Sequence, residues 1–278
     1  MIESKSLNKS FADYDSLFKE LKRSEKQLIK SKKSCVLKSA ECGQLSNINF
    51  TNKNTADKSI FKDNLIYPVI NTTNYLDSHE DVHFPGIWNK SLKEQQDNIY
   101  FRDSHQTSLR DIIAWPQDFK AFAQMVDWQM VGKSYAGQTQ ALIFEIDVTK
   151  VTHTVALEIF EKKRPVLGSV AMQYVQVKLA VNSNEIEYKE NKKLWDSKIN
   201  SIANIDEVNE LKYFFAVTEA KIAGEGSILT TPSNNATQIY YPNNKKSQPP
   251  IIDTAKQEPP ISTPNFEDFI KYFNTNFK

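Results

Sequence analysis

The chain has 278 residues, of which 35 are basic and 34 acidic, with a formal net charge of +1 at pH 7. This balance does not indicate a nucleic-acid-binding protein or a protein for acidic substrates. No segment reaches the roughly 18 apolar residues that a transmembrane helix requires, and the N-terminus lacks the apolar run of a secretory signal. We therefore expect one domain with tails, kept in a cytoplasm and away from membranes.

The N-terminal region, residues 1–62, is basic, with 13 Lys and Arg against 7 Asp and Glu. Between residues 8 and 33 the apolar side chains recur at spacings of three, four or seven, at Phe11, Tyr14, Phe18, Leu21 and Leu28. This spacing predicts an amphipathic helix whose apolar stripe needs a covering surface. The polar residues 38–62 predict a linker. Cys35 and Cys42 lack the spacing of a zinc or redox site, so we expect both to be reduced and structurally incidental.

The central region, residues 63–240, has short β-prone runs separated by turns, namely LIYPVINTTNY, DNIYFRD, TQALIFEIDV, SVAMQYVQVKLAV and KYFFAVTEAKI. These runs predict a mixed, mainly β fold. Helices are expected over 149–163, with an apolar stripe of Val151, Val155 and Ile159, and over 187–202. The chain has only seven glycines, so each is expected to mark a backbone constraint.

The C-terminal region, residues 241–278, begins with a polar, proline-rich stretch that predicts an extended linker. It ends in NFEDFIKYFNTNF, where the apolar spacing predicts a short amphipathic helix that needs a partner surface.

The stretch HEDVH, residues 79–83, matches the HExxH motif of zinc metalloproteases. That chemistry requires one helix that presents both imidazoles on the same face, with the glutamate as general base. The β-prone and turn-prone residues before the motif, and Pro85-Gly86 after it, disfavour such a helix. A polar turn between strands is the favoured interpretation, and a zinc site is the alternative.

A serine nucleophile requires a base within hydrogen-bond distance and a third group that orients the base. Ser169 follows Gly168 at the start of a predicted strand, and His105 ends the strand-like run NIYFRDSH. Glu219 places a carboxylate in the run KYFFAVTEAKI, which is otherwise suited to burial. Each of the three could equally be a surface residue, and only a fold could bring them together.

Five segments, in this order, resemble the prohead maturation serine proteases of tailed bacteriophages. The resemblance covers roughly residues 64–240, and its segments are DSHEDVHFPGIWNKSLKE, YFRDSHQTSLRDIIA, GQTQALIFEIDV, GSVAMQYVQVKLAV and YFFAVTEAKIAGEGSILTTPSNNAT. The resemblance implies His105 as general base, Ser169 as nucleophile and Glu219 as orienting carboxylate. It also implies the compact β-barrel with surrounding helices of the related herpesvirus maturational proteases. Two positions depart from the family, because Ala114 and Ala171 stand where the family has glycine.

The function implied by the resemblance is a serine endopeptidase that cleaves scaffold and capsid-protein extensions, and itself, inside the assembling prohead in the host cytoplasm. Its partners would be the scaffold and the major capsid protein. By analogy with related viral enzymes, a homodimer is also expected. No nucleic acid and no cofactor are expected. The tails would dock onto scaffold or capsid protein, and the linkers would be sites of self-cleavage. Two alternatives remain: a catalytically inactive relative that acts as a scaffolding or binding protein, and a zinc metalloprotease through HEDVH.

Overall fold

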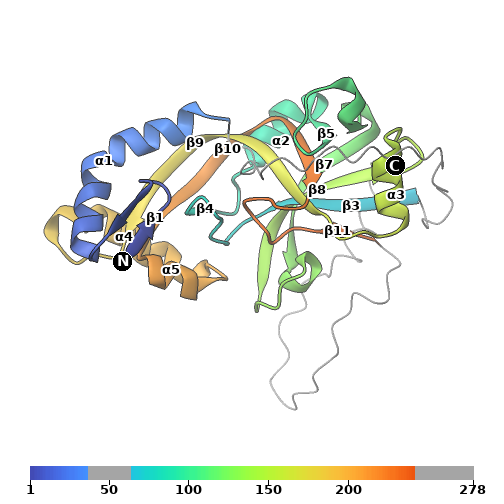
Figure 1. The fold of residues 1–278 in the computed structure, drawn as a ribbon. Helices are drawn as coiled ribbons and strands as arrows, with labels where there is room; N and C mark the ends of the chain where they lie inside the picture. The colour runs from blue at the N-terminus through green and yellow to red at the C-terminus, as the bar shows by residue number, and fades with distance from the viewer. Residues whose placement is uncertain (37–63, 242–278) are drawn as a thin grey trace, which may run out of the picture.

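A computed structural model describes residues 1–36 and 64–241 of the chain. These residues form a mixed α/β structure in which two long strands connect a helix-covered end of the molecule to a second sheet (Figure 1). The predicted linker that contains Cys42, the proline-rich linker and the C-terminal amphipathic helix all lie outside the described residues. None of the described helices is long and apolar enough to cross a membrane.

The described elements comprise strands, α-helices and short 3₁₀ turns. The strands are β1 (Ile2–Ser4), β2 (Lys9–Phe11), β3 (Leu65–Thr72), β4 (Asp81–His83), β5 (Tyr100–Asp103), β6 (Ile112–Ala114), β7 (Phe119–Asp127), β8 (Gln138–Asp147), β9 (Leu167–Val181), β10 (Tyr213–Leu229) and β11 (Ile239–Tyr240). The α-helices are α1 (Tyr14–Ser34), α2 (Asn89–Gln95), α3 (Thr154–Glu161), α4 (Lys189–Lys198) and α5 (Ile205–Leu211). The 3₁₀ turns are η3 (Gln96–Asn98), η4 (Leu109–Asp111), η5 (Pro116–Asp118), η6 (Trp128–Val131), η7 (Ile186–Tyr188) and η8 (Ile199–Ser201).

The described strands form two larger sheets, both open, rather than the closed β-barrel expected from the resemblance. One sheet has the order β4-β10-β5-β6, with β9 paired antiparallel to β10, and the other has the order β11-β3-β8-β7. A barrel requires a continuous ladder around its circumference. Within the described part of the chain, β7 pairs only with β8 and β11 only with β3, so the second sheet keeps two edges. The prediction of a mixed fold is confirmed, but helices and strands contribute almost equally, so the fold is not mainly β.

Two glycines allow the long strands β9 and β10 to pass close to the second sheet. A Cβ atom at Gly168 would lie 2.0 Å from the carbonyl oxygen of Val69 on β3. A Cβ atom at Gly226 would lie 2.7 Å from the ring of Phe144 on β8. Real Cβ atoms do not approach other atoms so closely, so these positions require glycine. The scarce glycines at these two places therefore mark backbone constraints, as the sequence predicts.

The amphipathic N-terminal helix is α1, and the chain itself covers its apolar stripe. Leu17, Phe18 and Leu21 are buried in the same hydrophobic cluster as core residues of β8, β9 and β10. The ring of Phe18 contacts that of Tyr188 edge-on, with centroids 6.0 Å apart. The fold itself thus covers much of the apolar stripe, and the docking of the N-terminal helix onto a scaffold or capsid protein stays a prediction.

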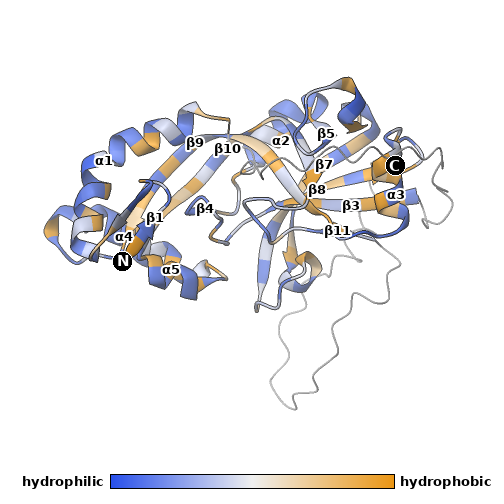
Figure 2. Ribbon diagram, viewed as in Figure 1, coloured by the Kyte–Doolittle hydropathy of each residue, from blue (hydrophilic) through white to orange (hydrophobic). Residues whose placement is uncertain are grey.

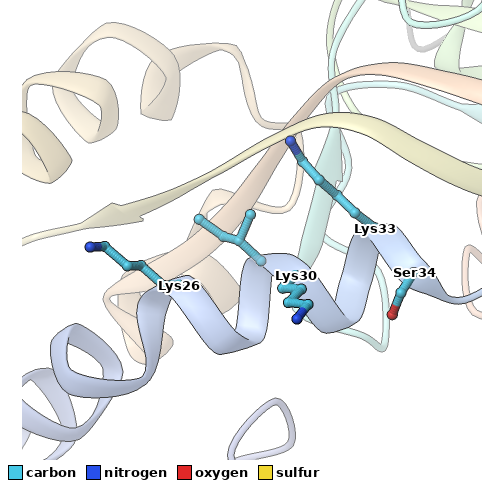
Figure 3. Close-up of a pocket in the computed structure, with 5 residues that line it drawn as sticks. Lys26, Lys30, Lys33 and Ser34 are labelled. Atoms are coloured by element: carbon cyan, nitrogen blue, oxygen red, sulfur yellow. The ribbon is translucent and has the colours of Figure 1, made fainter.

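The helix α1 carries several of the basic residues counted in the N-terminal region, and some of them are exposed. In the hydropathy view most of this helix is hydrophilic, whereas the strands that it covers contain more apolar segments (Figure 2). Lys26, Lys30 and Lys33 line an open hollow of about 480 Å³ together with Ile29 and Ser34 (Figure 3). Part of the basic charge of the N-terminal region is thus exposed on this helix.

Two further helices, α3 and α4, lie in the regions predicted for them, but α3 buries a different set of side chains from the one predicted. The helix α4 lies within the predicted range 187–202 and buries Trp195. The helix α3 is shorter than the predicted 149–163, because His153 caps its N-terminus by accepting a hydrogen bond from the Ala156 N–H at 3.1 Å. Its buried side chains are Ala156, Leu157 and Phe160. Val155 is 37 % exposed, so the predicted apolar stripe through this residue is wrong.

Candidate active site

The pleat of the first sheet places several polar side chains on one face. Ser169 on β9 lies opposite Ser227 on β10, and Ser227 lies opposite Arg102 on β5. Residues directly opposite each other in a sheet project to the same face, as do residues two apart on one strand. Glu225, two residues before Ser227, therefore shares this face. The alternation of three neighbouring strands thus gathers two hydroxyls, a carboxylate and a guanidinium.

His105 reaches this face from the turn that follows β5. Both Ser104 and His105 have a positive φ, at 49° and 57°, which turns the chain back over the sheet. The Nε2 atom of His105 lies 3.0 Å from the Ser169 Oγ atom, and its Nδ1 atom lies 3.2 Å from the Glu225 Oε1 atom. All three residues are buried, with exposed fractions of 9 % for His105, 6 % for Ser169 and 4 % for Glu225. The arrangement is a carboxylate–imidazole–hydroxyl chain.

The order of the three groups defines which proton each nitrogen can hold. A carboxylate accepts hydrogen bonds, so the imidazole donates its Nδ1 proton to Glu225. The neutral ring then has a lone pair at Nε2, which accepts the hydroxyl proton of Ser169. This geometry suits proton transfer from a serine to a histidine, and it is the geometry of serine hydrolases that use an acid, a histidine and a serine.

Glu225 also contacts a cation on its second oxygen. The Nε atom of Arg102 lies 3.4 Å from the Glu225 Oε2 atom. The Arg102 guanidinium lies over the ring of Tyr100, 4.8 Å from the ring centroid, and also donates a hydrogen bond to the carbonyl of Gln106 at 3.2 Å. These contacts hold a positive charge beside the buried carboxylate.

The turn after β10 holds the backbone next to Ser169. The Thr237 hydroxyl accepts a hydrogen bond from the Gly168 N–H at 3.1 Å and donates one to the Gly168 carbonyl at 3.0 Å. The Asn234 side chain of the same turn donates a hydrogen bond to the Thr72 carbonyl at 2.9 Å, which ties the turn to β3. The close packing of Gly168 on Val69 adds to this restraint. The position of Ser169 is therefore fixed from its N-terminal side.

The structure brings together two of the three predicted catalytic residues, His105 and Ser169, but places Glu219 elsewhere. The Glu219 Oε2 atom accepts a hydrogen bond from Gln176 at 2.8 Å, and its Oε1 atom lies 3.8 Å from the Lys90 ammonium. Six residues of extended strand, roughly 20 Å, separate Glu219 from Glu225. The carboxylate beside His105 is thus Glu225, and the assignment of Glu219 as orienting group is corrected.

The sequence reasoning missed Glu225 because it ended the last long strand too early. The residues AGEG after Ile222 resemble a turn, but β10 continues through them to Leu229. A register shift between Ile222 and Gly226 and a positive φ of 78° at Gly224 mark a bulge rather than a chain reversal. The available signal was a glutamate between two of the chain's few glycines.

Ala114 and Ala171, at the two positions where the family that the sequence resembles has glycine, are accommodated in the strands. Ala114 on β6 and Ala171 on β9 are both fully buried. Neither is among the described residues with a positive φ, so neither position requires glycine for its backbone conformation. The extra methyl groups therefore cause no backbone strain.

The HEDVH residues form a buried polar network and not a helix. His79 precedes β4, and His83 ends it. The His83 imidazole lies 3.1 Å from the Asn71 amide nitrogen and 3.0 Å from the Tyr174 hydroxyl oxygen. Burial lowers the pKa of His83 to about 3, so the ring is neutral at pH 7. Among the described residues, no group of three or more His, Cys, Asp or Glu side chains could hold a metal ion.

The same network ties α1 to β4 through one buried ion pair. The Lys32 ammonium lies 2.6 Å from the Asp81 Oδ1 atom, and the Tyr174 hydroxyl donates a hydrogen bond to the Asp81 Oδ2 atom at 2.8 Å. Lys32 also lies over the ring of Phe215, 4.4 Å from the centroid. Because the Asp81 side chain is completely buried, its carboxylate depends on these partners.

Replacing Lys32 with methionine is expected to lower the free energy of unfolding by about 3 kcal/mol, because it leaves the Asp81 carboxylate buried without its cation. Burial raises the pKa of Asp81, and loss of Lys32 would raise it further. The difference between variant and wild type should therefore be largest at neutral pH and shrink as the pH falls and the carboxyl takes up a proton. Urea unfolding at several pH values measures both effects.

Lys30→Met is the matched control, because Lys30 lies on the exposed face of the same helix. It should change the free energy of unfolding by less than about 0.5 kcal/mol. Adding Asp81→Asn to Lys32→Met should restore part of the lost stability, since it removes the unpaired charge. Equal stability of Lys32→Met and Lys30→Met at neutral pH would contradict the role given to the ion pair.

No family model, curated protein or solved structure matches the chain in the comparisons with known proteins. The interpretation of the site therefore depends on its geometry and on the resemblance in sequence motifs.

Proposed function

We propose that the chain is a serine endopeptidase that acts through Ser169, His105 and Glu225. The observation that supports this most strongly is the pair of contacts at His105, 3.0 Å to Ser169 and 3.2 Å to Glu225, made by the two nitrogens of one imidazole. Three residues from distant parts of the chain meet in the order that proton transfer requires. Motif positions alone identified two of them.

In the proposed reaction the Ser169 Oγ atom attacks a peptide carbonyl carbon while its proton passes to the His105 Nε2 atom. Glu225 stabilises the resulting imidazolium through Nδ1, and the Arg102 guanidinium lies beside its second oxygen. The imidazolium then gives its proton to the leaving amine, the C–N bond breaks, and an acyl ester on Ser169 remains. Water attacks this ester with His105 as base, which releases the acid product and restores the hydroxyl.

The biological setting of the proposal comes from the resemblance to prohead maturation proteases. In that setting the substrates are scaffold and capsid-protein extensions, and the chain itself, within an assembling phage prohead in the host cytoplasm. We also propose that the fold is related to that of the herpesvirus maturational proteases. The closed barrel expected from that relation is absent, because both larger sheets of the described residues are open. The exposed basic face of α1 is the N-terminal surface that remains available for acidic segments of such substrates.

A fluorophosphonate probe tests the proposal, because it reacts with serines that are activated by a neighbouring base. The wild-type chain should take up one probe molecule, and peptide mass spectrometry should locate it on Ser169. Labelling should be lost in His105→Gln, whereas His153→Gln should label normally, since His153 caps α3 and contacts Asp103 instead. Absence of labelling in the folded wild type would favour an inactive relative with a scaffolding or binding role.

A further inference from the structure

We propose that Ser227 is a positioning residue that fixes the His105 imidazole by holding the backbone of the turn on which His105 lies. This inference rests on the proposed function of the Ser169 site. The Ser227 hydroxyl oxygen accepts a hydrogen bond from the His105 backbone N–H at 3.1 Å. Ser227 is completely buried and lies directly opposite Ser169 on the paired strand.

The turn that carries His105 is held in an unfavourable backbone conformation. Ser104 and His105 are consecutive residues with positive φ, a region that residues with a Cβ atom rarely occupy. Such a conformation persists only where neighbouring groups enforce it. The direction of the His105 side chain depends on this backbone, because a different φ at residue 105 would point the imidazole away from Ser169.

Hydrogen bonds from three successive backbone N–H groups hold this turn in place. The Ser104 N–H donates to the Ile228 carbonyl at 3.0 Å, and the Gln106 N–H donates to the Asp103 carbonyl at 2.9 Å. Between them, the His105 N–H donates to the side chain of Ser227. Of these three acceptors only the Ser227 hydroxyl belongs to a side chain, so it is the one that a substitution can remove without altering the backbone.

Removal of the Ser227 hydroxyl should slow the reaction of Ser169, because the His105 imidazole would no longer be held in position. Ser227→Ala would remove the hydroxyl that accepts the hydrogen bond from the buried N–H of His105, which favours a rearranged turn. A displacement of about 1 Å in a reacting group can cost about 100-fold in rate. We therefore expect Ser227→Ala to slow fluorophosphonate labelling of Ser169 by about 10- to 100-fold. Ser227→Thr, which keeps the hydroxyl, should recover part of the rate.

The chain offers a matched control in Ser91. Ser91 is also buried, and its hydroxyl accepts the backbone N–H of Ile222, on the same strand β10, at 2.8 Å. Ser91→Ala therefore removes the same kind of bond from the same sheet, away from His105. It should lower the urea midpoint about as much as Ser227→Ala but change the labelling rate less than about threefold.

The experiment measures the labelling rate and the C2-proton resonance of His105 by NMR in wild type, Ser227→Ala, Ser227→Thr and Ser91→Ala. The chain has four histidines, so the His105 signal can be assigned with a His105→Gln variant. The proposal predicts that Ser227→Ala alone shifts this signal and slows labelling. An unchanged His105 signal in Ser227→Ala, or an equal change in Ser91→Ala, would overturn it. If the wild type does not label but Ser227→Ala still shifts the signal, the positioning role holds and the hydrolase proposal fails.

Discussion

Replacing Ser169 with alanine is expected to lower peptide hydrolysis by about 10⁶-fold, the scale found when a serine nucleophile is removed. If the chain cleaves itself in its proline-rich or polar linkers, freshly expressed wild type should lose mass with time. Ser169→Ala should remain at full length, because no hydroxyl is present to form the acyl ester. Intact-mass spectrometry of both proteins over the same time course measures the difference and gives the cut positions.

The control for this experiment is Ser197→Ala, because Ser197 is exposed and its hydroxyl donates a hydrogen bond to the Leu194 carbonyl of α4. It should be processed like the wild type. Equal trimming of wild type and Ser169→Ala would indicate a contaminating protease and remove support from Ser169. If both stay whole, the chain does not cleave itself, and the fluorophosphonate reaction decides whether Ser169 is activated.

Glu225→Gln is expected to slow hydrolysis by about 10⁴-fold, the scale found when the acid of a serine–histidine–acid site is replaced by its amide. The amide can donate a hydrogen bond to Nδ1, which favours the wrong tautomer of His105 and removes the charge that stabilises the imidazolium. Labelling and peptide hydrolysis should both fall. Unfolding should be measured in parallel, because the variant also leaves Arg102 without its carboxylate.

Glu219→Gln is the matched control on the same strand, and it should leave the rate within about twofold of the wild type, as expected for a surface substitution remote from the site. In the described part of the chain, the Glu219 carboxylate contacts Gln176 and Lys90. Loss of activity in Glu219→Gln with normal activity in Glu225→Gln would reverse the assignment made from the structure.

His105 and Ser169 were predicted from the resemblance in sequence motifs, and their places at the end of one strand-like run and the start of another agreed with it. The sequence was not sufficient for Glu225, because a bulge has no unique sequence signature and AGEG is equally typical of a turn. Ser227 and Arg102 could not be predicted for a different reason. Their positions depend on the register of β10 with β9 and β5, which is a property of strands distant in the sequence.

The same distinction applies to the fold. The five β-prone runs correspond to β3, β5, β8, β9 and the first part of β10, since alternation and β-branched residues are local signals. The open arrangement was not predicted, because β10 pairs with β4 and β5 along different parts of its length, and only long-range contacts determine that choice. The packing of α1 against β9 could not be predicted either. The spacing of apolar residues showed that the helix has a face to bury, but not which part of the chain covers it.

The order of the site residues along the chain has a consequence for biosynthesis. The imidazole, the hydroxyl and the carboxylate come from residues 105, 169 and 225, and β10 must pair with both β9 and β5 to bring them together. A ribosome that adds about 5–20 residues per second produces Ser169 several seconds before Glu225 and Ser227. During that interval the nascent chain lacks the orienting groups of His105, so the complete arrangement exists only after nearly the whole described chain has been synthesised and folded.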